Sequence, residues 1–466
     1  MALECGHIME TEIKPPHADG NKASYVPPLL RHSLNPIISE DEFVKPLEEN
    51  AKPLFRLATV IQKDKSGFNT RFYFNLMNEA EKLEVFLDDH GAKENKTWFY
   101  VRELVASIRN FSIAAFQLSH ILGRYRDYSP TESEHQVEEF LLHADDVVAQ
   151  INTIVSSLIG EAVSELKSCG CNMEVRSLSA ADFKEIGSKA KLPRTLEMES
   201  YKTSERMIMH IVESYRKVAI KITREQYGKK MAPEEFAKLI PARINETKVK
   251  ILESTLHNIQ SEYDTHIRMT QEESGDRELL SLRAFISIPM HLLEMARWLI
   301  HFYERHENEI HSDNSRNRIA ELVDKNLVLR LISGFCLFYT QRYMMMGKQM
   351  AEKVMTRLAR ITRISIPVPK PAGFHARPAY YITLVVEEHG TDAFLVVGNR
   401  KFDARSVLDL LEAGGLAADM ELSSVECEGD ERTLADIKIL SECNYCENEQ
   451  IPKELNYIRV ARNIMV

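Results

Sequence analysis

One apolar stripe between residues 137 and 158 constrains the fold of this chain more than any other sequence feature. Its members recur at alternating steps of four and three, at Val137, Leu141, Ala144, Val148, Ile151, Val155 and Leu158. This spacing places all of them on one face of an α-helix of about nine turns. Such a face must be buried against other helices, so we expect a helical bundle.

Similar patterns extend over most of the chain. Leu252, Leu256, Ile259 and Tyr263 follow the same steps, and no fixed-length repeat of the solenoid type is evident. Residues 1–51 are polar and rich in proline, which predicts a flexible arm. We therefore predict an all-helical bundle over residues 52–360, with helical patterns at roughly 96–127, 130–168, 196–226, 243–268, 277–308 and 315–360.

Length and charge limit the class of protein. The chain has 466 residues and a formal net charge of -10, so we expect several domains rather than one core. An acidic balance without basic blocks gives no support for nucleic-acid binding. The first residues lack the apolar core of a secretion signal, and no uninterrupted apolar run reaches about 18 residues. We expect a cytoplasmic protein without membrane insertion.

The seven cysteines do not form an evident disulfide framework or metal site. Cys169 and Cys171 are close in sequence, and Cys443 and Cys446 form a CxxC pair, but neither pair has the second half of a four-ligand zinc site. We expect reduced thiols, no metal and no cofactor.

Histidines and carboxylates in the helical segments were considered as ligands for two metal ions. His291, Glu294 and His301 share one segment, and Glu253 and His257 share another. A ferritin-like site needs an E-x-x-H motif on each of two helices, which these segments lack. Solvated or capped side chains are the favoured interpretation.

The sequence pattern changes near residue 363 from helical periodicity to short β-branched runs. The segments RISIPVP, DAFLVVGNRKF and DMELSSVEC predict strands, and Gly398-Asn399 predicts a hairpin turn within the second of them. Helices are expected at 376–389, around SVLDLLEA and at ERTLADIKIL. The order strand, helix, strand, strand, helix, strand, helix predicts a separate α+β domain over residues 363–442, followed by a C-terminal extension over 443–466.

The start of helix 376–389 carries the clearest chemistry in the chain. Gly373 permits a tight turn, and His375 falls at the N-cap position. Pro378 is tolerated in the first turn, where the N–H groups of Ala376 and Arg377 stay free at the positive end of the helix dipole. The imidazole is a nucleophile, and these donors with the Arg377 guanidinium suit a phosphoryl group. A lone histidine at a helix start is more often a cap or surface residue, but the surrounding residues favour phosphoryl transfer.

The segment GFHARPA at 373–379 resembles the active-site segment of HPr, the histidine phosphocarrier of the bacterial phosphoenolpyruvate-dependent sugar phosphotransferase system. The resemblance extends from about residue 363 to 440 and implies a βαββαβα fold with an antiparallel sheet, whose first strand lies at an edge. That position would accommodate Pro367 and Pro369. It also implies that His375 accepts phosphate, that Arg377 stabilises it, and that an enzyme I-like protein is the phosphoryl donor.

A second segment, RSVLDLL at 405–411, resembles the regulatory and partner-docking region of the same family. The resemblance implies that Ser406 is a regulatory phosphorylation site, although a serine at this position is also a favoured N-cap. Asp409 places a carboxylate in this region, which departs from the family pattern. The implied partner-docking residues are Phe374, Val407, Leu408 and Leu411.

Two hypotheses for function follow. The first is a phosphocarrier or phosphorylation-state sensor, in which His375 passes phosphate to another phosphotransferase-system protein or signals through the helical region. The second is a regulatory interaction protein whose HPr-like domain only docks partners. A catalytic site within the helical region is less favoured. The sequence leaves open the ligand of residues 52–360 and the oligomeric state.

Overall fold

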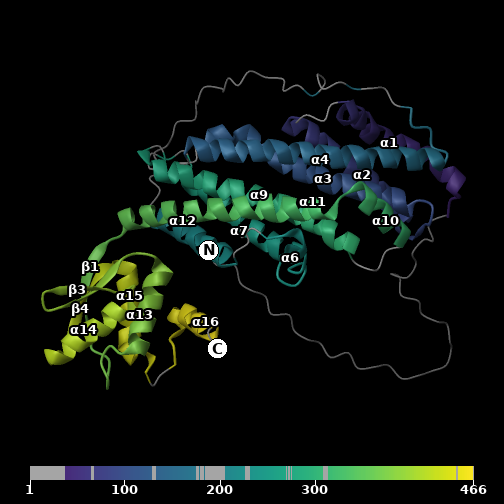
Figure 1. Cartoon of the computed structure of the whole chain (residues 1–466). Coiled ribbons are helices and arrows are strands. Elements are labelled where there is room, and N and C mark those ends of the chain that lie inside the picture. The colour runs from purple at the N-terminus through teal and green to yellow at the C-terminus, as the bar shows by residue number, and fades with distance from the viewer. Residues whose placement is uncertain are drawn as a thin grey trace, which may run out of the picture.

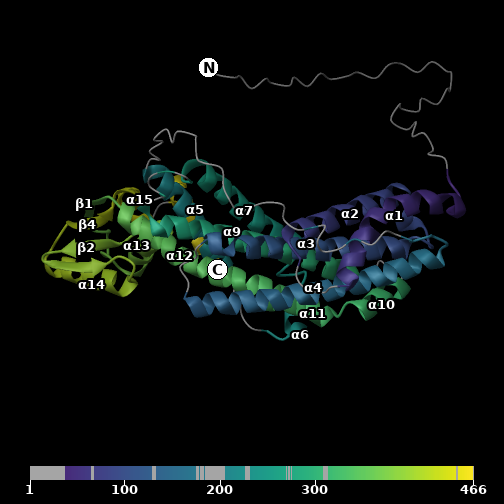
Figure 2. The ribbon, with the colours of Figure 1, turned by 90° about the horizontal axis from the view of Figure 1, so that it is seen from above.

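A long helical region is followed by a smaller α+β region in the computed structural model (Figure 1). The helices lie largely along one direction, and the α+β region lies at the end of the molecule opposite α10 (Figure 2). The residues that the structure describes are 37–63, 68–128, 133–174, 178, 183, 205–225, 231–268, 270, 273, 275–307, 313–447 and 450–464.

The helical region runs from residue 40 to residue 358, where the periodic apolar stripes predicted 52–360. Helix α9 lies among α3, α7 and α12, while α4 packs against α3. Helices α11 and α12 are joined without a break by the π-helical segment η4. The elements are α1 (Glu40–Lys63), α2 (Thr70–Asp89), η2 (Ala92–Glu94), α3 (Phe99–Tyr128), α4 (Glu134–Ser168), α5 (Glu205–Arg224), α6 (Pro233–Ala237), α7 (Glu246–His266), α9 (Arg277–Glu307), α10 (Asp313–Leu322), α11 (Lys325–Arg330), η4 (Leu331–Leu337) and α12 (Phe338–Leu358).

The stripe at 137–158 is the inner face of α4. Its last five members are buried, and Val137 and Leu141, near the helix start, are half-buried. Ser133 and Gln136 form a capping box that fixes where the helix begins. The predicted long helix is confirmed, because the apolar face finds partners along most of its length.

The predicted arm over residues 1–51 is wrong at its C-terminal end, since α1 begins at Glu40. Ser39 and Glu42 form reciprocal capping contacts, a signal that is present in the sequence. The helix contains Pro46 and Pro53, each of which removes a backbone donor. Phe43, Leu47, Ala51 and Leu54 are buried on one face, so tertiary burial outweighs the cost of the prolines. Residues 1–36 lie outside the described residues.

Among the described residues, two helices are long and apolar enough to cross a membrane by length and composition. They are α4 and the segment Arg277–Arg305 of α9. Half of the most apolar window of α4 and 78% of that of α9 are buried inside the protein. The core helix of a soluble protein can have the same length and composition. These two properties therefore do not distinguish a core helix from a membrane-spanning helix.

The α+β region has the predicted order of elements and a four-stranded antiparallel sheet. The strand order is β1-β4-β2-β3, so β1, with Pro367 at its end, lies at an edge as expected. One face of the sheet contributes to the core with the helices, while charged residues of the other face form ion pairs such as Arg363–Glu428. The elements are β1 (Ile361–Pro367), α13 (Ala376–His389), β2 (Ala393–Val397), β3 (Arg400–Asp403), α14 (Val407–Asp419), β4 (Ser424–Asp430) and α15 (Glu431–Glu442).

The C-terminal extension is part of this core rather than a separate tail. It contains η5 (Asn444–Cys446), η6 (Lys453–Leu455) and α16 (Asn456–Ile464). Tyr445, Leu455 and Ile458 are buried in the same apolar cluster as Phe374 and Val386. The boundary predicted at 442/443 therefore does not separate two packing units.

Helix α5 joins the helical region to the far end of α13. The Arg216 guanidinium donates hydrogen bonds to the backbone oxygens of Glu387, at 2.6 Å, and Glu388, at 3.0 Å. These are carbonyls of the last turn, which carry the negative end of the helix dipole and lack intrahelical partners. Gly390 follows in the left-handed region, and a Cβ there would overlap the Arg216 side chain. The contact thus needs both residues.

We predict that Arg216→Ala lowers the free energy of unfolding by about 2–3 kcal/mol, because it removes two charge-assisted hydrogen bonds and leaves two partly buried carbonyls without their donor. The matched control is Lys217→Ala, which removes an ion pair to Glu388 on a side chain that is 54% exposed and is expected to cost less than about 1 kcal/mol. Urea denaturation of the full chain measures both. Equal losses would show that the Arg216 bonds do not carry the contact.

Candidate functional site

The backbone around His375 has the geometry that the sequence predicts. Gly373 has a φ of 69°, in the left-handed region that favours glycine. His375 is the N-cap of α13, with φ −84° and ψ −174°, and its N–H donates to the Gly373 carbonyl at 2.8 Å. The tight turn at 373–375 therefore brings the imidazole to the mouth of the helix.

The first turn of α13 offers donors for an anion. The side chain of His375 does not cap the helix, and the Ala376 and Arg377 N–H groups contact no acceptor within the described part of the chain. Pro378 has no N–H to satisfy. The side chains of His375 and Arg377 are 36% and 52% exposed. The site thus combines a reachable nucleophile with free backbone donors.

Helix α14 holds the loop before His375 in place. Gly414 lies so close to this loop that a Cβ on it would stand 2.8 Å from the backbone oxygen of Phe374 and 3.0 Å from its Cβ. Only a residue without a side chain permits this approach. The site therefore depends on α14 as well as on α13.

A carboxylate that the sequence analysis missed completes the site. Glu447, just after η5, places Oε1 2.8 Å from His375 Nε2 and Oε2 3.5 Å from Arg377 Nη1. Arg377 Nη1 also donates to the backbone oxygen of Glu447 at 3.3 Å. No local motif marks Glu447, because the contact arises only when the C-terminal extension folds back on the loop.

Phe374 departs from the exposed position expected of a docking residue. It is 2% exposed, and its ring meets that of Tyr445 edge-on with centroids 5.7 Å apart. The C-terminal extension covers it. By contrast, Leu408 is 76% exposed, Leu411 is 36% exposed and Val407 is half-buried. The apolar surface near the site is therefore formed by the start of α14.

Ser406 is the N-cap of α14. Its Oγ accepts a hydrogen bond from the Asp409 N–H at 3.2 Å and donates one to Asp409 Oδ1 at 2.8 Å. The capping interpretation is confirmed, and Asp409 has a local structural role in it. Phosphorylation of Ser406 stays a prediction.

Two of the histidines considered as metal ligands, His291 and His301, are packed against other side chains. His291 Nδ1 lies 2.7 Å from Gln117 Oε1, and burial lowers the pKa of His291 to about 3. His301 Nδ1 lies 2.8 Å from a carboxylate oxygen of Glu246. Burial raises the pKa of Glu294. The solvated alternative is therefore wrong for His291, which is neutral and hydrogen-bonded.

Neither a metal cluster nor a disulfide was found among the described residues. No group of three or more His, Cys, Asp or Glu side chains within them is arranged to hold a metal ion. Cys443 and Cys446 are thiols whose sulfur atoms lie 3.4 Å apart. Burial raises the pKa of Cys171 to about 11, which disfavours the thiolate that a metal ion or a nucleophilic reaction requires.

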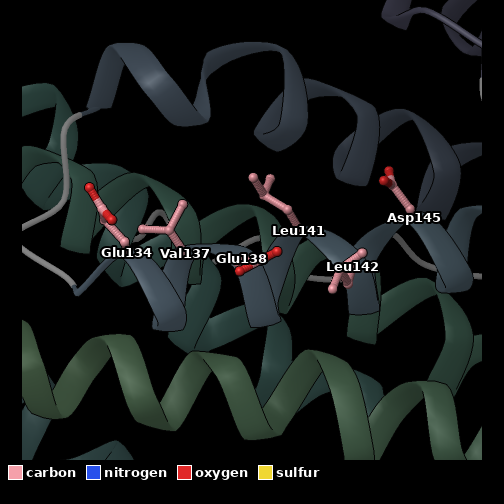
Figure 3. Close-up of a pocket in the computed structure, with 6 residues that line it drawn as sticks. All are labelled: Glu134, Val137, Glu138, Leu141, Leu142 and Asp145. Atoms are coloured by element: carbon pink, nitrogen blue, oxygen red, sulfur yellow. The ribbon is translucent and has the colours of Figure 1, made fainter.

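Two depressions on the helical region are weaker candidates. One, of about 930 Å³, has charged walls, but Arg102 within it is bound by Glu84, Asp88 and Glu103. Its ion pairs join α2 to α3 and therefore have a structural role. The other, of about 310 Å³, is lined by residues of α4 alone, including the exposed Leu142 (Figure 3). It brings together no elements distant in sequence.

No family model, curated protein or solved structure matches the chain. The assignment of the candidate site therefore rests on its geometry alone. It consists of a histidine, an arginine and free backbone donors at the N-terminus of α13, with a carboxylate from the C-terminal extension.

We predict that Gly414→Ala disturbs the candidate site and lowers the free energy of unfolding by about 1–3 kcal/mol, because the new methyl group overlaps the loop at Phe374. Gly415→Ala is the control. It lies in the same helix with nothing within 4 Å of an added Cβ and should stabilise α14 by about 0.5–1 kcal/mol. Urea denaturation measures both changes. Stabilisation by Gly414→Ala would contradict the tight contact.

Proposed function

We propose that the α+β region is an HPr-like phosphocarrier or phosphorylation-state sensor that accepts a phosphoryl group on His375. The observation that carries this proposal is the imidazole at the N-cap of α13, beside the free N–H groups of Ala376 and Arg377. Helix N-termini bind phosphate because their donors and dipole both favour negative charge. The Arg377 guanidinium adds a permanent charge that matches phosphate oxygens.

The reaction requires few chemical groups of the protein. A lone pair of a neutral imidazole nitrogen attacks phosphorus, the bond to the donor's leaving group breaks, and that group takes the bonding electrons. The product is a phosphoimidazolium whose remaining proton stays on the other ring nitrogen. Backbone donors and Arg377 stabilise the oxygens as charge moves onto the histidine. Onward transfer is the same step in reverse, with a nucleophile of the acceptor in place of the leaving group.

The exposed side chains of α14 support a partner surface beside the site. Leu408 and Leu411 are solvent-exposed, and α14 touches the His375 loop through Gly414. We propose that an enzyme I-like donor and a phosphotransferase-system acceptor or regulatory protein bind there in turn. The helical region contacts α13 at its other end, through Arg216, which leaves this surface open.

One observation favours the second candidate function, a docking protein that does not transfer phosphate. Glu447 already occupies the charged partners that a phosphoryl group needs. A domain with this contact permanently closed would bind partners through α14 alone. Labelling of His375 separates the two functions.

We predict that the full chain acquires one acid-labile phosphate at His375 when incubated with phosphoenolpyruvate and enzyme I. His375→Ala should abolish the label. Arg377→Ala should slow labelling by about tenfold or more, because it removes a charge-assisted contact to the phosphoryl oxygens. The measurement is mass spectrometry under neutral or alkaline conditions, where phosphohistidine survives.

The control for this experiment is His210→Ala, which removes an exposed histidine of α5. This variant should be labelled to the same extent as the wild-type chain. Circular dichroism checks that each variant is folded. Undiminished labelling of His375→Ala would place the phosphate elsewhere. An unlabelled wild-type chain would favour the docking function.

A further inference from the structure

The Glu447 carboxylate stands where a phosphoryl group on His375 would find its charged partners. It lies between the imidazole and the guanidinium of Arg377, and its side chain is only 12% exposed. Arg377 is engaged twice, by Oε2 and by the backbone oxygen of Glu447. A phosphoryl group carries about two negative charges at pH 7 and would repel a carboxylate held this close in a partly buried site.

The contact between Glu447 and His375 differs from that of a carboxylate that orients a catalytic imidazole. Glu447 Oε1 is buried and accepts no aligned hydrogen bond within the described residues, although His375 Nε2 is 2.8 Å away. At the other end of α13, His389 Nε2 and Asp436 Oδ2, at 2.9 Å, do form such a bond. The Glu447 carboxylate is therefore held by the charge of Arg377, for which an incoming anion can compete.

The turn that carries Glu447 is docked on the loop before His375. Asn444 Nδ2 donates to the Lys370 backbone oxygen at 2.7 Å, and the Lys370 N–H donates to Asn444 Oδ1 at 2.9 Å. The Tyr445 hydroxyl donates to the Pro367 backbone oxygen at 2.8 Å, and its ring covers Phe374. These contacts tie residues 444–447 to the loop that presents His375.

The same turn has a strained backbone. Asn444, Tyr445 and Cys446 have φ values of 46°, 54° and 56°, a region that residues with a side chain rarely adopt. Three such residues in a row persist only when surrounding contacts hold them. Loss of the Glu447 contact removes one of these restraints. We therefore expect the turn to relax its backbone when that contact is lost.

We propose that Glu447 is an internal latch, whose carboxylate competes with the phosphoryl group for Arg377, so that phosphorylation of His375 displaces it and loosens the turn 444–447 from the loop 367–374. This inference rests on the proposed function. It gives the phosphorylated state a structural consequence within the chain, in a segment that contacts Phe374, which α14 also contacts. Neutralising Glu447 should make His375 a faster acceptor.

The test uses the full chain and phosphoramidate, a small donor that needs no partner protein. An imidazole nitrogen forms a bond to phosphorus, the phosphorus–nitrogen bond of phosphoramidate breaks, and ammonia leaves with the electron pair. Glu447→Gln keeps the size of the side chain and removes its charge. Its rate constant for labelling His375, followed by ³¹P NMR, should rise by about tenfold, which corresponds to about 1.4 kcal/mol in the barrier.

The control is Glu454→Gln, an exposed carboxylate of the same extension, which should react at the wild-type rate. The second readout is hydrogen exchange on the unmodified and phosphorylated wild-type chain, which should become faster at residues 444–447 on phosphorylation. Both results together support the latch.

Each other outcome overturns the latch. Equal rates for Glu447→Gln and the wild type, with both labelled at His375, would show that the carboxylate does not compete. A slower rate would make Glu447 a positioning residue. Unchanged exchange at 444–447 would show that the turn stays docked. If neither chain is labelled at His375, the proposed function fails as well, so the two failures are distinguishable.

Discussion

The bond between Arg216 and the end of α13 is the interaction on which the arrangement of this protein depends. The last carbonyls of a helix have no partners of their own, and here a guanidinium from the helical region supplies them. The left-handed glycine at 390 makes room for that side chain. One end of α13 is thereby bonded to the helical region, and its other end presents His375. A single helix thus links the helical region to the candidate site.

The two ends of α13 carry opposite partial charges and are contacted by groups of opposite charge. The negative end is neutralised by Arg216, while the positive end is left with free donors and is approached by the Glu447 carboxylate. An internal anion in this position shows that the site is already arranged for negative charge. The proposed latch follows from this arrangement, because Arg377 would be a charged partner of both anions.

The helical region is held together by helix packing. Its long stripes are buried against one another, and its charged depression of about 930 Å³ is crossed by ion pairs that join neighbouring helices. His291 is held neutral by burial and bonded to Gln117. Buried polar groups of this kind specify how helices pack. Within the described residues, the chemistry of the chain is concentrated at the start of α13, and the bundle fixes the opposite end of that helix.

Local sequence signals determined much of this protein. The four-and-three spacing of apolar residues predicted α4, the order of short segments predicted the α+β region, and Gly373 and Pro378 predicted the helix start at His375, because each depends on neighbours along the chain. The tertiary structure alone decided the rest. Burial kept α1 helical through two prolines, Tyr445 covered Phe374, and Glu447 reached His375. These contacts join residues far apart in sequence, and their energies exist only once the chain path brings the residues together.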